Sequence, residues 1–358
     1  MSVISTDALI IGAGPVGLFQ VFELGLLGLK AHIVDPLPQP GGQCSELYPD
    51  KPIYDIPAIP KIGAQELIDQ LMEQIAPFEP VLHLSETVAT VVKKEDGRFQ
   101  VVTDAGKEFD AGVVIIAGGV GAFEPRRLKK PGAAELEGTS LFYSVKDRTK
   151  HYGKHLVIFG GGDSALDWTL DFLGHAASVT LVHRSQTFRA QPASVSRMFE
   201  ACEKLEMMFL EGTAEGVVTD ADGTLNGVQI RGKDRIVRSL ECDELLVFWG
   251  MSPKLGPIGT WGLELHKRNQ VIVDTEKFQT NVEGIFAVGD INYYPGKKKL
   301  ILSGFHEAAL AAFAIKAHLF PGEKVFLQYT TTSPKMHQRL KVDNPYTQKD
   351  MEAGPPVD

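Results

Sequence analysis

Two glycine-rich motifs contain the residue types best suited to binding a phosphate. The first reads Gly12-Ala13-Gly14-Pro15-Val16-Gly17, and the second, 148 residues later, reads Gly160-Gly161-Gly162-Asp163-Ser164-Ala165. Each follows a short apolar run and precedes a helical pattern, which is the context that such a motif requires. Glycine lets the backbone turn tightly and approach a pyrophosphate, while the helix N-terminus supplies free N–H groups. Two such motifs predict two nucleotides bound by one chain.

The first motif has two further features that favour a flavin nucleotide. Asp35 follows Gly14 by 21 residues and ends the next apolar run, where its carboxylate would accept hydrogen bonds from a ribose. Much later in the chain, the apolar run at 284–288 ends in Gly289-Asp290. An aspartate at the end of such a returning strand would lie near the ribityl and pyrophosphate groups of FAD. A glycine-rich turn with a purely structural role is the alternative.

The second motif has the form G-x-G-x-x-A and is followed by basic rather than acidic residues. The next apolar run ends in His183-Arg184, with Arg189 five residues further on. An acid here would repel a ribose 2′-phosphate, whereas arginine pairs with it through charge-assisted hydrogen bonds. The pattern therefore predicts NADP(H) at the second motif. Ordinary surface charge remains the alternative interpretation of the two arginines.

The elements that position these motifs follow one order, used twice. Each half has a strand, a helix and a strand, then a further helix, a hairpin and another buried strand. The hairpins are predicted around Asp96-Gly97 and Asp222-Gly223, and residues 36–60 are predicted to be a long functional loop. The chain is therefore predicted to be α/β, with two Rossmann-like three-layer dinucleotide-binding domains. We expect an FAD domain of residues 1–122 and 252–358, with an NADP domain of residues 123–251 inserted into it.

Bulk composition excludes several other classes of protein. The chain has 358 residues, a length typical of two domains, and its net charge of −9 argues against nucleic-acid binding. No apolar run reaches the roughly 18 residues that a membrane-spanning helix needs, and no secretory signal is evident. The three cysteines are odd in number and widely spaced, which argues against a disulfide scaffold. We expect a cytoplasmic protein without a metal site.

Five further segments resemble a known family. They are Pro40-Gly41-Gly42-Gln43, Leu47-Tyr48-Pro49-Asp50-Lys51, Thr280-Asn281, Gly289-Asp290 and Tyr329-Thr330-Thr331-Thr332-Ser333. With the two glycine motifs, they make the chain similar over its whole length to the ferredoxin–NADP⁺ reductases of thioredoxin-reductase-like type, which are two-dinucleotide-domain flavoproteins. The resemblance implies a homodimer and a set of FAD contacts at matching positions: Asp35, Gln43, Tyr48, Val88, Phe123, Asp290 and Thr331. Related reductases often have a second arginine where this chain has Ser185.

The positions of the cysteines separate this chain from its disulfide-reducing relatives. Thioredoxin reductases carry Cys-x-x-Cys near the start of the NADPH domain, where residues 141–147 here contain no cysteine. Cys44 stands alone in the region where larger disulfide reductases have a cysteine pair. A dithiol relay is therefore not expected. An oxidase or peroxidase that cycles Cys44 through sulfenic acid remains an alternative, as does a non-catalytic flavin-bound sensor.

Without a thiol relay, bound flavin would exchange electrons directly with a protein carrier. Tyr48 is expected to stack on one face of the flavin and Tyr329 on the other, with His337 as the alternative to Tyr329 and simple packing as another role for Tyr329. The expected activity is electron transfer between NADPH and ferredoxin or flavodoxin, by hydride transfer and then single-electron transfer.

An acidic carrier would need a basic surface for docking. Candidate surfaces are the groups Lys297-Lys298-Lys299, then Lys335, Arg339 and Lys341, and finally Arg126, Arg127, Lys129 and Lys130, although each run could simply be a solvated loop.

Overall fold

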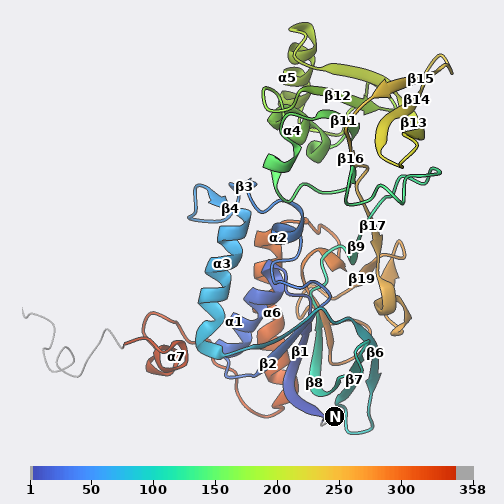
Figure 1. Ribbon diagram of the computed structural model, residues 1–358. Helices are drawn as coiled ribbons and strands as arrows, with labels where there is room; N and C mark the ends of the chain where they lie inside the picture. Colours follow the sequence, from blue (N-terminus) through green and yellow to red (C-terminus); the bar gives the residue numbers. More distant parts are fainter. Residues whose placement is uncertain (1–2, 344–358) are drawn as a thin grey trace, which may run out of the picture. The chain divides into compact units, whose positions relative to one another are not determined.

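A computed structural model of the chain describes residues 3–343, without the side chains of residues 122–124 and 251–254. The chain divides into two compact units, residues 1–122 with 254–358 and residues 123–253 (Figure 1). The segments that join them, β9 (Ala122–Pro125) and β17 (Met251–Lys254), pair as a two-stranded sheet. The predicted α/β class, with one dinucleotide-binding unit inserted into another, is confirmed. The second join lies two residues later than the sequence analysis placed it.

The first unit is built on a mixed sheet whose buried strands are parallel. β5, β2, β1 and β8 lie in that order, and β20 pairs with the second half of β8. The hairpin β6–β7 extends antiparallel from the first half of β8. The sheet strands are β1 (Ile4–Ile11), β2 (Ala31–Asp35), β5 (Val81–Leu84), β6 (Val88–Lys93), β7 (Phe99–Thr103), β8 (Glu108–Ile116) and β20 (Ile285–Ala287). Small sheets comprise β3 (Pro52–Ile53) with β4 (Ile62–Gly63), and β18 (Leu265–His266), β19 (Gln270–Ile272) and β21 (Asn292–Tyr293).

Three helices lie side by side against this sheet: α1 (Pro15–Leu26), α3 (Ala64–Ile75) and α6 (Ile301–Leu319) (Figure 1). Helix α1 begins at a proline, whose missing N–H costs nothing at that position, and buries Leu18, Val21 and Leu24. It contacts both α3 and α6. Two shorter helices complete the unit, α2 (Gln43–Leu47) and α7 (Pro334–Leu340). The first turn of α6 lies close to that of α1 and so to the glycine motif, because a Cβ on Gly304 would overlap the side chain of Val16.

The second unit repeats the plan. Five parallel strands run in the order β10, β16, β11, β12 and β13, and β14 and β15 extend the sheet antiparallel. Helices α4 (Asp163–Asp171) and α5 (Pro192–Glu203) pack against each other. The strands are β10 (Leu141–Phe142), β11 (His155–Gly160), β12 (Ser178–His183), β13 (Met208–Thr219), β14 (Leu225–Gly232), β15 (Val237–Glu241) and β16 (Glu244–Phe248).

The region 36–60 differs from its predicted form. It was predicted to be a loop, but Gln43–Leu47 form helix α2 and Pro52–Ile53 pair with Ile62–Gly63. A five-residue helix has too few apolar positions to show helical periodicity, so the local glycines and prolines dominated the pattern. Helix α2 lies against α3, which stabilises it by tertiary packing.

Two candidate nucleotide-binding sites

The first glycine motif forms a tight turn between β1 and α1. Gly12 has φ +113°, and a Cβ there would lie 2.5 Å from the carbonyl oxygen of Ala117 on the neighbouring chain segment. A Cβ on Gly17 would overlap the carbonyl oxygen of Gly12, so only glycine lets α1 pack this close to its own turn. Gly14, by contrast, has no atom within 4 Å of its Cβ position. The turn is closed on its protein side and open at Gly14, as a bound pyrophosphate requires.

Asp35 has a structural role in addition to its predicted one. It ends β2, is 5% exposed, and its two carboxylate oxygens accept hydrogen bonds from the N–H groups of Ala13 (2.6 Å) and Leu37 (2.8 Å). Burial raises the pKa of Asp35, and these two hydrogen bonds oppose that shift. Each oxygen keeps a lone pair that a ribose hydroxyl can use. Asp35 therefore holds the glycine turn in place and can still receive a ribose.

The segment that begins at Pro40 lies directly against the glycine motif. The N–H of Gly41 donates to the carbonyl of Ala13 (2.8 Å), and a Cβ on Gly42, which has φ +57°, would lie 3.2 Å from Cα of Gly14. The hydroxyl of Ser45 next to this contact is buried without a hydrogen-bond partner. A cradle of glycines with an unpaired hydroxyl fits the phosphate-bearing part of FAD.

Tyr48, Cys44 and Asp290 come together beside this cradle. Burial raises the pKa of the half-buried Tyr48 phenol, and the nearby Cys44 and Asp290 raise it further. Burial also raises the pKa of Asp290. Gln43 opens helix α2 near Gly119, at the end of β8. The structure thus gathers Gln43, Tyr48 and Asp290 around one region, as expected for residues that line a flavin.

Cys44 does not have the environment of a reactive thiol. It is 2% exposed, and burial raises its pKa to about 11. A reactive cysteine needs a lowered pKa and access to solvent, because the thiolate is the nucleophile.

Glu307 on α6 is a residue of this site that the sequence motifs did not indicate. This carboxylate is fully buried and accepts hydrogen bonds from the N–H of Gly289 (2.7 Å) and the side-chain amide of Asn292 (2.8 Å). Lys297 forms an ion pair with it. A single acidic residue in an apolar helical run was the one signal that pointed to it, since buried glutamates are rare unless paired.

The C-terminal residues predicted to contact FAD are not brought to this site within the chain. Tyr329 and Thr331 are exposed and precede α7, which lies at the C-terminal end of α1, the end opposite to Gly14. His337 is 4% exposed and donates a hydrogen bond to the carbonyl of Thr330 (2.6 Å). The side chain of Val88 is in the core of the unit, which leaves only its backbone for a ligand. The side chain of Phe123 lies outside the described residues.

The second glycine motif repeats the geometry of the first between β11 and α4. A Cβ on Gly160 would lie 2.6 Å from Cβ of Ala165 and 2.7 Å from the carbonyl oxygen of Phe248, whereas Gly162 has open space at its Cβ position. Asp163 and Ser164 are exposed in the first turn of the helix. The carboxylate of Asp163 accepts a hydrogen bond from the N–H of Gln191 (2.8 Å). The open helix N-terminus is suited to a second pyrophosphate.

The basic residues after β12 lie beside this second motif. The imidazole of His183 packs on Gly161, where a Cβ would overlap its ring, and the N–H of Arg189 donates to the carbonyl of Gly161 (2.7 Å). Burial lowers the pKa of His183, and Arg184 and Arg189 lower it further. Arg184 lines a cavity of about 170 Å³ together with Arg231 and Lys233 on the β13–β14 side, two cations that the sequence analysis did not consider. Glu211 also lines this cavity.

The structure corrects part of the predicted basic surfaces. The side chain of Lys297 is only 3% exposed because it pairs with Glu307. The guanidinium of Arg339 donates a hydrogen bond to the carbonyl of Leu26, the last residue of α1. Lys341 forms an ion pair with Glu79. Lys298, Lys299 and Lys335 remain exposed. Arg127 pairs with Glu137 in the second unit.

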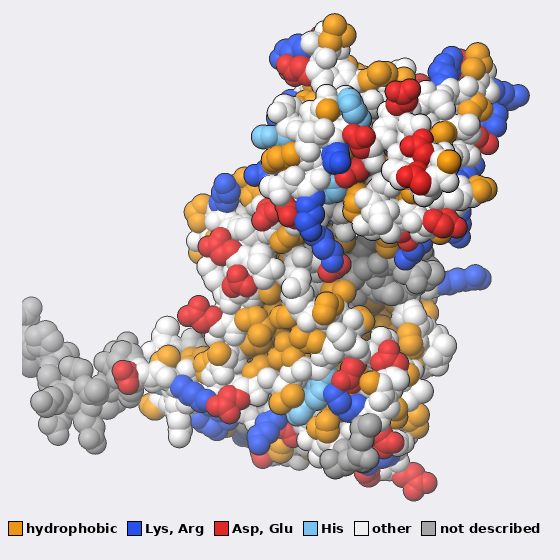
Figure 2. All heavy atoms as spheres, viewed as in Figure 1, with side chains coloured by type: hydrophobic (Ala, Val, Ile, Leu, Met, Phe, Trp, Pro, Cys, Tyr) orange, Lys and Arg blue, Asp and Glu red, His pale blue; other side chains and the backbone are white. Residues whose placement is uncertain are grey.

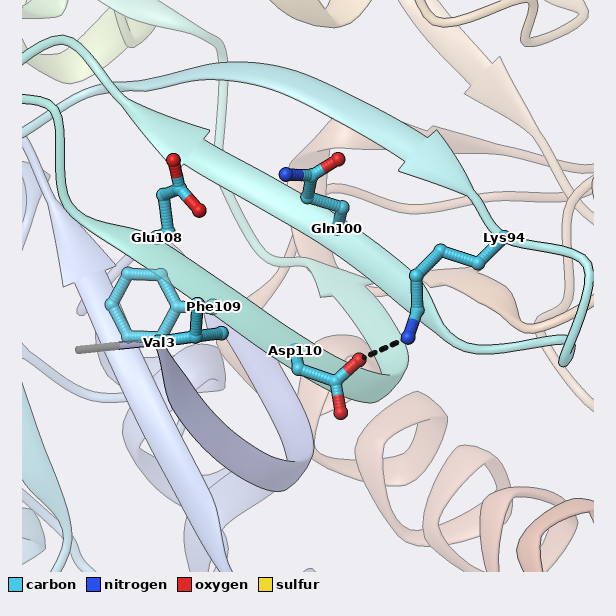
Figure 3. A pocket seen from close by; sticks show the side chains of 6 residues that line it. All are labelled: Val3, Lys94, Gln100, Glu108, Phe109 and Asp110. Atoms are coloured by element: carbon cyan, nitrogen blue, oxygen red, sulfur yellow. Dashed lines mark ion pairs between the residues drawn. The ribbon is translucent and has the colours of Figure 1, made fainter.

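Other features of the surface do not add a catalytic cluster. A cavity of about 330 Å³ at β7 and β8 is lined by Gln100, Glu108 and an ion pair of Lys94 with Asp110 (2.8 Å) (Figure 3). Residues 3–343 contain no grouping of three His, Cys, Asp or Glu side chains suited to a metal ion. Within the same part of the chain, no helix combines the length and apolar character needed to cross a membrane.

Comparison with known proteins identifies the family. The model of the pyridine nucleotide-disulphide oxidoreductases matches residues 6–313. The chain belongs to the pyridine nucleotide-disulphide oxidoreductase family. Among its relatives, a ferredoxin–NADP reductase 2 of Cupriavidus necator is 60% identical, covering 95% of this chain and 91% of that protein. A ferredoxin–NADP reductase of Methylibium petroleiphilum is 57% identical, covering 96% and 94%. The predicted resemblance is therefore confirmed.

Solved structures agree with this pyridine nucleotide-disulphide oxidoreductase fold. Thioredoxin reductase from Lactococcus lactis has a TM-score of 0.74 at 24% identity, covering 88% of this chain and 99% of that one. The enzyme from T. acidophilum has a TM-score of 0.73 at 22% identity, covering 87% and 98%. The family implies FAD and NADP(H) as cofactors, and the two glycine cradles fit them. This member nevertheless has no Cys-x-x-Cys anywhere in its sequence.

Proposed function

We propose that this protein is a ferredoxin–NADP reductase that holds FAD in its first unit and NADPH in its second. The observation that supports this most strongly is the pair of glycine cradles with opposite charge beside them. Asp35 accompanies the first, while His183, Arg184 and Arg189 accompany the second. An acid suits an unphosphorylated ribose, and a cationic cluster suits a ribose 2′-phosphate.

The residues of the first unit would bind and orient FAD. The N-terminus of α1 and the open Gly14 would receive the pyrophosphate, Asp35 the ribose, and Asp290 the ribityl region. Tyr48 and Gln43 would lie along the flavin ring, with Tyr48 providing an aromatic face. When bound, FAD would supply the chemistry of accepting a hydride from NADPH and passing on single electrons. The protein would contribute position and electrostatics.

The residues of the second unit would select NADPH. The N-terminus of α4 would bind the pyrophosphate, and Arg184 and Arg189 would pair with the 2′-phosphate through charge-assisted hydrogen bonds. Ser185 removes one cation from the pattern that related reductases have, so the preference for NADPH would rest on these two arginines. Arg231 and Lys233, which line the cavity beside Arg184, are paired with Glu215 (3.0 Å) and Glu211 (3.8 Å).

An acidic one-electron carrier, ferredoxin or flavodoxin, is the proposed partner. Lys298 and Lys299 are exposed and follow the Asp290 turn by eight and nine residues. Positive charge there would steer an acidic protein to the flavin end of the first unit. Lys335 is a further exposed cation on the C-terminal segment.

We also propose that the protein is a cytoplasmic homodimer. Figure 2 shows hydrophobic side chains gathered on the face of the first unit where α1 and α6 lie. Phe19 and Phe22 on α1 and Phe305 on α6 are only partly buried, and a second copy would cover them. The free thiols of Cys44, Cys202 and Cys242 are compatible with a reducing compartment. Light scattering after size-exclusion chromatography tests the dimer.

Anaerobic rapid mixing tests the proposed activity. The flavin of the purified holoenzyme should bleach with NADPH, faster than with NADH, and should be reoxidised when oxidised ferredoxin is added. A dithiol-protein substrate should not reoxidise it. Bleaching without reoxidation by ferredoxin or flavodoxin would overturn the proposal, and failure of NADPH to bleach the flavin would favour a non-catalytic flavin-bound sensor.

The alternative of a Cys44-dependent oxidase or peroxidase is tested by one variant. The buried thiol, with its pKa of about 11, should contribute nothing to turnover, so Cys44→Ser should keep the activity of the native enzyme. Loss of NADPH oxidation or of peroxide reduction in Cys44→Ser would support the alternative instead.

A further inference from the structure

The buried carboxylate of Glu307 on α6 is bonded by the segment of residues 289–297, which follows β20. Oε2 of Glu307 accepts from the N–H of Gly289 (2.7 Å) and from Nδ2 of Asn292 (2.8 Å). Oε1 accepts from the hydroxyl of Tyr294 (2.9 Å) and pairs with Lys297. The side chains of Glu307 and Lys297 are 0% and 3% exposed. Four donors thus converge on one carboxylate.

These contacts hold both sides of Asp290. Gly289 precedes Asp290 and has φ +78°, a backbone conformation that glycine adopts readily. Asn292 follows it and also donates to the carbonyl of Ala287, at the end of β20 (3.0 Å). The Glu307 carboxylate therefore connects the two ends of the turn that presents Asp290.

Helix α6 is in turn held against α1 at the end where the glycine motif lies. A Cβ on Gly304 would overlap the side chain of Val16, so the two helices approach closely in their first turns. The side-chain amide of Gln20 donates to the carbonyl of Ala308, the residue after Glu307 (3.1 Å). Contacts with α1, the helix whose N-terminus is proposed to face the pyrophosphate, therefore fix the position of α6 and of Glu307 on it.

The charges of Lys297 and Glu307 shift the pKa of Asp290. Burial is the main cause of the raised pKa of Asp290, which Lys299 and Lys297 oppose and Glu307 reinforces. A buried ion pair adds little net stability compared with apolar side chains of the same size. In a low-dielectric interior, however, charges act strongly on neighbouring groups.

We propose that Glu307 and Lys297 are positioning residues that hold the Asp290 turn and set the reduction potential of the flavin bound beside it. The proposal rests on the proposed function only in that FAD occupies the first site. Lys297 adds positive charge near the flavin and favours the added electron, while Glu307 opposes it. The two charges thus shift the reduction potential of bound FAD in opposite directions.

The test uses holoenzyme variants that keep a hydrogen-bonding group and remove one charge. Lys297→Gln should lower the midpoint potential of bound FAD, and Glu307→Gln should raise it. The double variant should return toward the native potential, and Lys297→Arg, which keeps the charge, should retain it. The potential is measured by equilibrium reduction against a dye, together with the dissociation constant for FAD from the fluorescence of flavin added to apoprotein. Both glutamine variants should bind FAD several-fold more weakly.

Matched controls separate this role from a general effect on folding. Lys324→Gln removes an exposed charge outside the Asp290 turn, and Glu323→Gln removes an exposed partner of Lys316. Both should leave the potential and the FAD affinity unchanged. If Glu307→Gln does not fold, Tyr294→Phe replaces it. That variant removes one donor, leaves the Glu307 charge less compensated, and should shift the potential in the same direction as Lys297→Gln.

The outcomes are distinct. Opposite shifts in Lys297→Gln and Glu307→Gln, absent in the controls, support the proposal, as does a lowered potential in both Lys297→Gln and Tyr294→Phe where Tyr294→Phe is the variant used. Absent shifts, or equal shifts in the two glutamine variants, would overturn it and leave the pair with a structural role alone, visible as a lower melting temperature. None of these measurements uses NADPH or ferredoxin, so they are independent of the carrier. Failure of the native chain to bind FAD would instead overturn the proposed function.

Discussion

At the scale of single residues, charge distinguishes the two cradles. Asp35 and Asp290 lie by the first, and Arg184 and Arg189 lie by the second. The first glycine of each motif, Gly12 or Gly160, has the same steric reason to be glycine, because a Cβ there would lie too close to a carbonyl oxygen of the neighbouring segment. The identity of each nucleotide therefore depends on a few side chains at the ends of the strands.

Replacing Arg184 with alanine should reduce the preference for NADPH. Loss of a charge-assisted contact with the 2′-phosphate should raise KM for NADPH by roughly tenfold to a hundredfold, with little change for NADH. Steady-state kinetics with both nucleotides measure this. Arg238→Ala, which removes an exposed arginine paired with Asp234 in the same unit, is the matched control. Equal losses with NADPH and NADH would show that Arg184 does not recognise the phosphate.

At the scale of elements, the packing of α1 on β1 decides whether the first cradle forms. Gly17 permits that packing, whereas a Cβ on Gly14 would meet no protein atom within 4 Å. The two glycines of one motif therefore have separable roles, one in the fold and one toward the ligand.

Alanine at each position should reveal this difference. Gly17→Ala should destabilise the apoprotein by about 1–3 kcal/mol because the helix must move from its turn. Gly14→Ala should change the stability of the apoprotein by less than about 0.5 kcal/mol but weaken FAD binding roughly tenfold or more. Thermal unfolding of apoprotein and fluorescence titration with FAD measure the two effects. A Gly14→Ala variant with native FAD affinity would contradict the predicted pyrophosphate position.

A second feature at this scale is a chain of polar side chains across the edge of the first sheet. His32 on β2 is hydrogen-bonded to His83 on β5 (3.0 Å), His83 to Lys107 (3.0 Å), and Lys107 pairs with Glu86. Burial lowers the pKa of both histidines below the ordinary 6.5, and Lys107 lowers that of His83 further. The N–H of Glu86 donates to the carbonyl of Asp35 (3.1 Å), which links this edge to the first cradle.

The stability of the first unit should therefore fall with acid. The folded state favours neutral His32 and His83, so the unfolded chain binds protons first as the pH decreases. The free energy of unfolding should be highest above the unfolded pKa of 6.5 and should decrease as the pH falls toward the lower folded pKa values. Denaturant titrations at about pH 7.5 and about pH 5.5 measure this. His83→Asn should reduce the dependence, whereas His306→Asn, at an exposed position on α6, should not. An unaltered dependence in His83→Asn would contradict this role.

At the scale of the whole molecule, the net charge of −9 makes any basic docking surface local. Lys297 is buried, Arg339 donates to the carbonyl of Leu26, and Lys341 is exposed but paired with Glu79. Among the predicted lysines of the first unit, Lys298, Lys299 and Lys335 are exposed and form no ion pair within the part of the chain that the structure describes. Electrostatic attraction to an acidic carrier should therefore depend on few residues and should weaken with salt.

Reversing two of these charges should affect the carrier alone. Lys298→Glu/Lys299→Glu should lower kcat/KM for ferredoxin by roughly tenfold, and the native rate should fall as ionic strength rises. NADPH-dependent reduction of ferricyanide, a small acceptor, serves as the internal control and should be unchanged. Arg238→Glu controls for charge reversal elsewhere. Equal losses with both acceptors would show that the variant acts on the flavin and not on docking.

Much of the architecture could be predicted because it depends on local patterns. The strand–turn–helix signals at Gly12 and Gly160 and the Asp-Gly hairpins each involve residues close in the chain. Short elements such as α2 and β3 were missed because tertiary contacts, not periodicity, stabilise them. The roles of Lys297 and Arg339 could not be predicted either. Their partners, Glu307 and the carbonyl of Leu26, are 10 and 313 residues away, and a charged side chain in a loop gives no local sign of burial.

The sequence by itself determined the two nucleotide motifs, their opposite flanking charges and the absence of a cysteine pair, since these are properties of residue type and spacing. Only the tertiary structure decided which side chains are available to a ligand or partner. It buried Cys44, enclosed Lys297 with Glu307, and placed Tyr329 at the far end of α1 from Gly14. The physical reason is that burial and long-range pairing depend on which segments the fold brings together, and these determine whether a thiol is reactive or a lysine is exposed.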